Sequence, residues 1–398
     1  MAASSSNSSV RLQVDPETGY LLACLAHGLD SNRPWPHPPR GLDWKRLLAL
    51  LDRHRLAGFF HALGKSHSET WPREFQESLR SERYRWMAHG GKSRARVHSA
   101  LMALRSGGVE VIVLKGWAFI STLYNGDASQ RLCEDVDLLV RPRDVDRAEA
   151  ILRSLGCALH LVVWPGYDHR FHNGERFFFS NDPIGQGDPF SIGLHWGLFH
   201  TPSYDPTQVD VDALFERARP LNVADVPVLE LSREDAILYA CGHIALHHRF
   251  DDALFRSFEL AWLIHNAAGP DWETAARRAS QWRLLIPVRR GLERLTRLWP
   301  DLVPDSAVEA FRRPIASRRE RLVDFWLSHA RALPGNELLL RWLTFHDWKR
   351  RPLLVFQDIF PGPDYLKGRY GPPPLGFWPF LYFLRLARAV GQLIRRGD

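Results

Sequence analysis

The chain has 398 residues, which is too long for one ordinary hydrophobic core and predicts two or three packed units. Its 45% hydrophobic and 24% charged residues are typical of a soluble globular protein, and the net charge of +7 favours an acidic partner without choosing among nucleotide, nucleic acid and anionic membrane. The four cysteines are scattered without a Cys-x-x-Cys spacing, which excludes a disulfide framework or a zinc site built on them. No apolar stretch reaches the length of a membrane span and residues 1–9 lack a secretion signal, so we expect a cytoplasmic protein.

The N-terminal part of the chain is expected to be disordered over residues 1–15 and helical over residues 16–105. Trp44, Leu47 and Leu51 recur at helical spacing, which predicts an amphipathic helix there. Gly107 and Gly108 end this region, because glycine accepts the backbone conformation that closes a helix. An α/β core is predicted to follow over residues 106–230.

A short apolar strand followed by a glycine turn opens that core. The β-branched run at 111–114 suits a buried strand, and Lys115 and Gly116 follow it directly. Gly116 lets the backbone turn into a helix whose first amides remain open to an anion. The pattern therefore predicts a phosphate site at Lys115 and Gly116.

Two carboxylates come next, on a second predicted strand at 132–140. Asp135 and Asp137 are separated by one residue, so their side chains point to the same face of the strand. Paired carboxylates repel each other unless a cation lies between them, and hard oxygen ligands suit Mg²⁺. A phosphate site beside such a pair is typical of phosphoryl or nucleotidyl transfer.

The rest of the core alternates helix and strand signals. A helix is predicted from Pro142 to Gly156, strands at 159–163, 175–179 and 190–196, and a hairpin turn at Asn173-Gly174. Residues 231–345 are predicted to be helical again, starting at a capping box in which Ser232 bonds a free amide and Asp235 reaches back. Residues 346–398 form a Pro-rich, aromatic tail.

These residues together resemble the nucleotidyltransferase superfamily, in particular its branch with a Leu-Lys-Gly turn and an Asp-x-Asp-Leu-Leu-Val strand. The resemblance covers about residues 20 to 395 and keeps the family's order of motifs: Leu114-Lys115-Gly116, Asp135-Val136-Asp137-Leu138-Leu139-Val140, Leu194-His195-Trp196, His243, His247, Asp271-Trp272 and Tyr365-Leu366. It implies an α+β fold like that of DNA polymerase β, with a small mixed β-sheet flanked by N- and C-terminal helical regions.

The implied reaction is transfer of a nucleoside monophosphate from a nucleoside triphosphate to a hydroxyl, with release of pyrophosphate. Asp135 and Asp137 would be the catalytic metal ligands, for Mg²⁺ or Mn²⁺, while Gly116 and Lys115 would contact the triphosphate. The branch implies a small-molecule, peptide or protein acceptor, in keeping with natural product biosynthesis, rather than nucleic acid.

One position departs from the family pattern. The third carboxylate commonly lies two residues before the His-Trp pair, and here that residue is Gly193. Asp188, Glu175 or His195 would have to replace it, and the sequence does not choose among them. The alternative is a non-catalytic protein of the same fold that binds a nucleotide or a partner.

Several further candidates remain. Arg131 suits a phosphate clamp or a structural role, and His195 is a candidate nucleotide contact at a strand end. His243 and His247 lie one helical turn apart, but Ile244 stands where H-E-x-x-H has its glutamate, so packing or a phosphate contact is favoured over a metal site. Glu259 lies where the family tends to have an acidic residue, and a structural ion pair explains it equally well. The aromatic and basic segment 377–388 suits peripheral contact with a membrane interface, or packing on its own domain.

Overall fold

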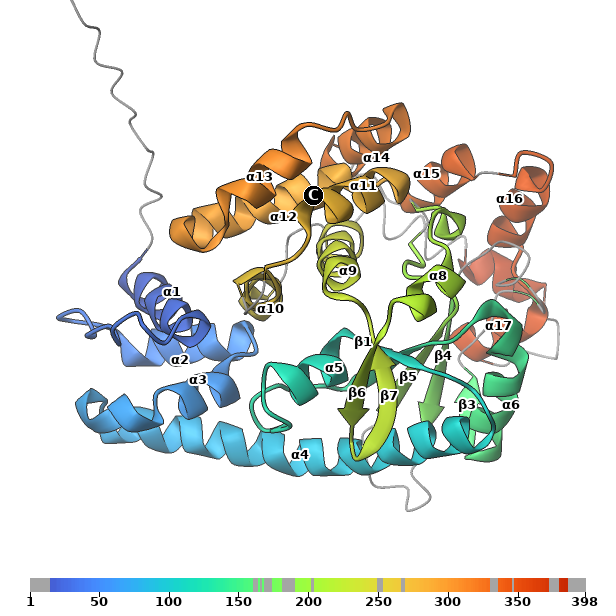
Figure 1. The fold of residues 1–398 in the computed structure, drawn as a ribbon. Helices are drawn as coiled ribbons and strands as arrows, with labels where there is room; N and C mark the ends of the chain where they lie inside the picture. Colours follow the sequence, from blue (N-terminus) through green and yellow to red (C-terminus); the bar gives the residue numbers. More distant parts are fainter. Residues whose placement is uncertain are drawn as a thin grey trace, which may run out of the picture.

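The structure is a computed structural model that describes residues 15–159, 164, 167, 174–180, 190–201, 204–248, 253–265, 269–329, 336–345, 347–371 and 379–385. It confirms the expected α+β class: a mixed β-sheet is flanked by helices on both its N- and C-terminal sides (Figure 1). Residues 1–14 of the expected disordered start, Asn173, Asp188 and residues 346, 372–378 and 386–398 of the C-terminal tail lie outside the described residues.

The N-terminal helices form one packed layer. Asp15 caps the first of them by accepting from the Thr18 amide, and Asp43 caps the second through the amides of Lys45 and Arg46. The helices are α1 (Pro16–Leu29), α2 (Trp44–Arg53), α3 (Ala57–Leu63), a 3₁₀ turn (Lys65–Thr70) and α4 (Arg73–Ser106).

Helix α4 is 34 residues long and runs beneath both the N-terminal helices and the sheet (Figure 1). Its first half contributes Phe75, Leu79 and Trp86 to the core of the N-terminal layer. Its second half contributes Val97 and Leu101 to the core behind the sheet. One helix therefore joins two hydrophobic cores.

Seven strands of the described chain form one sheet in the order β3-β4-β5-β2-β1-β7-β6. β2 lies at its centre, antiparallel to β1 and parallel to β5. The strands are β1 (Ile112–Leu114), β2 (Asp135–Leu139), β3 (Cys157–Leu159), β4 (Glu175–Ser180), β5 (Phe190–His195), β6 (Arg219–Val223) and β7 (Val226–Glu230). Short helices connect them: α5 (Lys115–Thr122), a 3₁₀ turn (Pro142–Asp144), α6 (Val145–Ser154), a 3₁₀ turn (Pro206–Gln208) and α8 (Val211–Glu216).

The two faces of the sheet differ in what covers them. Val113, Val136 and Leu138 belong to the same apolar core as residues of α4 and α6. Ile112, Leu114 and Leu139 belong instead to the core that the N- and C-terminal helices share. Because side chains alternate along a strand, Asp135 and Asp137 lie on this second face.

The C-terminal helices begin where the sequence predicts. Ser232 caps α9 by accepting from the Asp235 amide. The second half of the expected capping box is wrong: the Asp235 carboxylate is fully buried and pairs with Arg217 and Arg278, since two guanidinium groups satisfy a buried charge better than one amide does.

The C-terminal region is a series of helices. They are α9 (Arg233–Leu246), α10 (Leu254–His265), α11 (Trp272–Gln281), α12 (Leu285–Leu298), a 3₁₀ turn (Pro300–Leu302), α13 (Asp305–Arg312), α14 (Arg318–His329), α15 (Asn336–Thr344), α16 (Arg351–Ile359) and α17 (Pro363–Tyr370). No helix of the described residues is both long and apolar enough to cross a bilayer.

Candidate active site

The candidate site starts from Asp135 and Asp137 on β2. Strand pairing sets Asp137 opposite Leu114 of β1 on one side and opposite Gly193 of β5 on the other. Burial, followed by repulsion from Asp137, raises the pKa of Asp135. The two carboxylates therefore lie close enough together to affect each other's charge, as the sequence predicts.

Lys115 lies against this acid pair. Its Nζ is 2.8 Å from Asp137 Oδ2 and 3.1 Å from His243 Nε2. Burial opposes the lysine's charge, but Asp137 together with Tyr239 and Asp135 outweighs that effect and raises the pKa of Lys115. In turn, although burial opposes the carboxylate's charge, Lys115 and then His195 lower the pKa of Asp137. The positive charge of Lys115 thus lies at the position where a cation bound to Asp137 would lie.

The turn that carries Lys115 has an uncommon backbone. Lys115 has a φ of +28° and Gly116 a φ of +31°, both in a region that residues with a side chain rarely adopt. A Cβ on Gly116 would lie 2.8 Å from Cys133 Sγ, so the position also has no room for a side chain. Strain of this kind is typical of functional sites, and no described side chain caps the N-terminus of α5 here.

Gly193 creates a space that other acidic and basic groups occupy. A Cβ at this position would lie 2.6 Å from Asp137 Oδ1, 2.9 Å from Glu175 Oε1 and 3.0 Å from His195 Nε2. Glu175 comes from β4, where it pairs directly with His195. Of the three replacements open from the sequence, the structure brings Glu175 and His195 to Asp137, while Asp188 lies outside the described residues.

His195 links the two buried acids. Its Nε2 is 3.1 Å from Asp137 Oδ1 and 2.9 Å from Glu175 Oε1. Burial opposes the imidazolium, but Glu175 and Asp137 outweigh it and raise the pKa of His195 to about 10. His195 therefore carries a positive charge at neutral pH in this arrangement.

More histidines continue from this pair toward α9. The ring of His200 lies 6.1 Å from that of His195 and 4.4 Å from that of His247, and His247 stacks on His243 at 4.9 Å. Burial lowers the pKa of His247 to about 2 and that of His243 well below its usual value. His243 is thus neutral and accepts a hydrogen bond from Lys115.

Arg131 reaches the site with its charge already paired. Its Nε is 2.6 Å from Glu259 Oε1, and the guanidinium stacks 4.0 Å above the Phe255 ring. Tyr124 donates a hydrogen bond to the same glutamate at 3.4 Å. The structural interpretation of Arg131 and Glu259 agrees with this geometry, and the phosphate clamp stays a prediction.

A cavity of about 800 Å³ opens in front of these residues, within the range of small-molecule sites. Its walls come from α5, α9 and α10, and its lining includes Lys115, Gly116, Asp135 and Arg131. Phe119, Phe255 and Trp262 supply an aromatic side to the same space. Asp137 is only 5% exposed and lies behind Asp135 and Lys115.

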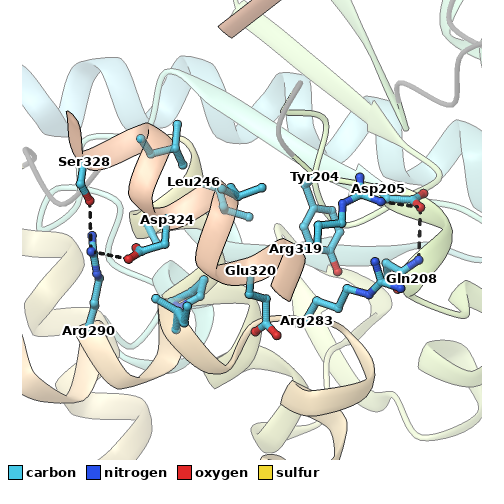
Figure 2. A pocket seen from close by; sticks show the side chains of 15 residues that line it. Tyr204, Asp205, Gln208, Leu246, Arg283, Arg290, Arg319, Glu320, Asp324 and Ser328 are labelled. Carbon is cyan, nitrogen blue, oxygen red and sulfur yellow. Dashed lines mark hydrogen bonds and ion pairs between the residues drawn. The ribbon is translucent and has the colours of Figure 1, made fainter. Parts of the chain in front are cut away.

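A second cavity, of about 60 Å³, lies among the C-terminal helices (Figure 2). Its basic residues face acidic partners: Arg290 Nη2 is 2.7 Å from Asp324 Oδ2 and Arg319 Nη1 is 3.7 Å from Asp205 Oδ2. The volume is too small for a nucleotide. The cavity beside Asp135 is therefore the candidate site.

His200 is the residue of this region that sequence analysis missed. It follows β5 in a short loop and belongs to none of the motifs that the sequence shows. Its proximity to Glu175 arises from the antiparallel pairing of β4 with β5, which no short-range pattern specifies.

Comparison with known proteins agrees with the fold class. A family model described as uncharacterised nucleotidyltransferase matches residues 40–300, which include the whole sheet and helices α9 to α12. The chain belongs to this nucleotidyltransferase family. No curated protein and no solved structure matches it significantly.

Proposed function

We propose that the protein transfers a nucleoside monophosphate from a nucleoside triphosphate to a hydroxyl of a small-molecule, peptide or protein acceptor. The observation that carries this proposal is Asp135 and Asp137 on one strand, beside a cavity that Lys115 and Gly116 also line. In the transfer, the acceptor oxygen bonds to the α-phosphorus, the bond to the bridging oxygen breaks, and pyrophosphate leaves with the electron pair.

The donor set fits a divalent metal ion. Asp135 and Asp137 supply carboxylate oxygens, the ligands that Mg²⁺ prefers, and Mn²⁺ accepts the same set. Asp135 and Asp137 would hold the ion, whereas Glu175, which occupies the space over Gly193, pairs with His195. When bound, Mg²⁺ neutralises and orients phosphate oxygens.

Lys115 has a second task in this proposal. Its ammonium group pairs with Asp137 and lines the cavity at the same time. With an ion held by Asp135 and Asp137, Lys115 would contact the triphosphate and add positive charge there. Phe119 and Trp262, which line the same cavity, offer a surface on which a nucleobase packs.

A direct assay tests the function. The protein is incubated with each nucleoside triphosphate, Mg²⁺ and a cell extract, and pyrophosphate and labelled product are measured. We expect both to form with the native chain and to vanish in Asp137→Asn and Asp135→Asn. The exposed Asp301→Asn serves as the control and keeps the activity.

The Lys115–Asp137 ion pair also favours a second candidate, a nucleotide-binding protein without turnover. In that case the lysine stays paired and Gly193 marks a lost catalytic acid. Nucleotide binding without pyrophosphate, across all triphosphates and with Mg²⁺ or Mn²⁺, would select this function over transfer.

A further inference from the structure

Three nitrogen and oxygen donors converge beside the acid pair without belonging to it. They are Glu175, His195 and His200, whose ligand atoms all lie within 4.8 Å of one another. Glu175 Oε1 and His195 Nε2 are 2.9 Å apart, and Glu175 Oε2 contacts His200 Nδ1. Ligands bonded to one zinc ion at about 2.0–2.2 Å lie at comparable distances from each other.

Buried polar atoms in this group lack hydrogen bonds of normal geometry to any described residue. They are Glu175 Oε2, His195 Nδ1, His200 Nδ1 and, on the adjoining helix, His247 Nε2. Because Glu175 Oε2 and His200 Nδ1 contact each other, the atoms left without a described partner are His195 Nδ1 and His247 Nε2. A buried polar group without a partner costs free energy, so an ion that His247 also binds would remove part of this cost. The His247 ring lies 4.4 Å from that of His200, close enough to join the same group.

Strand pairing positions two of these residues, and the third is partly exposed. Glu175 and His195 are directly paired across β4 and β5, and their side chains are 2% and 3% exposed. The His200 side chain is 33% exposed, so an ion reaches the group past this residue.

We propose that Glu175, His195 and His200, with His247 beside them, form a second metal site that takes a divalent transition metal ion such as Zn²⁺. Two imidazoles and one carboxylate suit zinc and its neighbours, whereas Mg²⁺ prefers oxygen ligands alone. The site lies next to Asp137 through His195 but uses different ligands from the Mg²⁺ pair. The proposed second metal site does not depend on the protein being a nucleotidyltransferase.

The charges around the group agree with this occupant. Asp137 and Glu175 are buried carboxylates that both lie next to His195 Nε2, and Lys115 contacts the first of them. A divalent ion at Glu175 takes the place of the proton that His195 otherwise carries and neutralises the acid that Lys115 does not contact. Its binding also fixes the ring of His195, whose Nε2 lies 3.1 Å from Asp137 Oδ1.

Metal analysis tests the site on the full-length protein. The chelator-treated protein is dialysed against Zn²⁺ in excess Mg²⁺, and bound zinc is measured by mass spectrometry. Co²⁺ is titrated in parallel, because its visible absorption reports ligand type and geometry. We expect about one Zn²⁺ per chain and a Co²⁺ spectrum of few-coordinate nitrogen and oxygen ligation.

The test variant is His200→Gln, since this histidine is the least buried of the three and its loss is the least disruptive to folding. It should weaken Co²⁺ binding by about 10-fold or more. His248→Gln is the matched control, because His248 contacts His243 and none of the proposed ligands. Glu175→Gln, checked for native circular dichroism, should lose the ion as well.

The outcomes separate this site from the proposed function. Asp135→Asn should abolish pyrophosphate formation and still bind Zn²⁺. A native protein that retains no Zn²⁺ and gives no Co²⁺ spectrum overturns the second site, whatever the transfer assay shows. The same holds if His200→Gln binds Co²⁺ as tightly as His248→Gln does.

Discussion

At the scale of single residues, Gly193 decides how the acids are arranged. The three atoms nearest to where its Cβ would be belong to Asp137, Glu175 and His195, and all lie within 3.0 Å. The position at which the family commonly has an acidic side chain therefore has no side chain here. The carboxylate of Glu175, from the neighbouring strand β4, occupies that space.

We expect Gly193→Ala to disrupt this arrangement. The new methyl group would displace Asp137, Glu175 and His195, lowering nucleotidyl transfer by at least about 10-fold and stability by about 1–3 kcal/mol. Pyrophosphate release and urea denaturation measure the two effects. Gly91→Ala on α4 is the control: a Cβ there meets nothing within 4 Å, so activity should not change. Equal activity of the two variants would contradict the role given to Gly193.

At the scale of elements, buried contacts attach α10 to the rest of the molecule. The Arg131–Glu259 ion pair connects the segment before β2 with this helix, and both side chains are under 10% exposed. At the start of α10, the Leu254 amide donates to His54 Nδ1 of the N-terminal layer at 3.2 Å. Since α10 forms a wall of the cavity, these contacts also set the shape of the site.

Replacing one partner of the buried Arg131–Glu259 pair should lower the free energy of unfolding more than replacing both. Arg131→Met or Glu259→Met alone leaves an uncompensated buried charge, which costs about 3–5 kcal/mol. The double variant should lose clearly less than the sum of the two. Urea denaturation of the four proteins measures this coupling. The exposed pair Arg73–Glu77 is the control and should change stability by less than about 1 kcal/mol. Strictly additive losses at Arg131 and Glu259 would refute the coupling.

The His54 contact predicts a pH dependence. Burial, then the nearby Arg53 and Arg294, lowers the pKa of His54 below its usual value of about 6.5. Below that pH the unfolded chain takes up a proton that the folded chain does not, so stability falls as the pH drops, by no more than about 1.4 kcal/mol per pH unit for this group. His54→Gln should shrink the loss of Tm between pH 7.5 and 5.5, whereas the exposed His37→Gln should not. An unchanged slope in His54→Gln would rule out this contribution.

The elements also show where sequence reasoning succeeds and where it stops. The strands of Asp137 and His195 were predictable, because each is a short segment of mostly apolar residues with a titratable residue at one end. The β6–β7 hairpin was not, because its turn uses Ala224 and Asp225 at positive φ where an Asn-Gly or Asp-Gly pair would have signalled it. The meeting of Glu175 with His195 depends on strand register, and the meeting of His200 with His247 on the docking of α9. Neither is encoded at short range.

At the scale of the whole molecule, the cavity lies between two cores. The sheet, backed by α4 and α6, supplies Asp135, while α9 and α10 supply the opposite wall. A ligand in this cavity contacts both units, and so its binding stabilises the folded state of the entire chain.

Nucleotide binding should therefore raise the Tm. At a concentration 100 times its Kd, a nucleoside triphosphate with Mg²⁺ should add about 2.7 kcal/mol of stability. Thermal unfolding followed by dye fluorescence measures the shift. Asp135→Asn should lose most of it, and the exposed Asp301→Asn should keep it. A shift of the same size in the presence of a chelator would show that the metal ion takes no part in binding.

The length of helix α4 is constrained, because its buried side chains follow one stripe along all 34 residues. Each residue of an α-helix turns the chain by about 100°. One alanine inserted after Gly91 would rotate Phe75, Leu79 and Trp86 out of phase with Val97 and Leu101, so only one of the two groups would remain inward. Seven inserted residues would restore the phase and instead push the two ends about 10 Å further apart. The length of α4 between these two groups is thus fixed by the two cores that the helix joins.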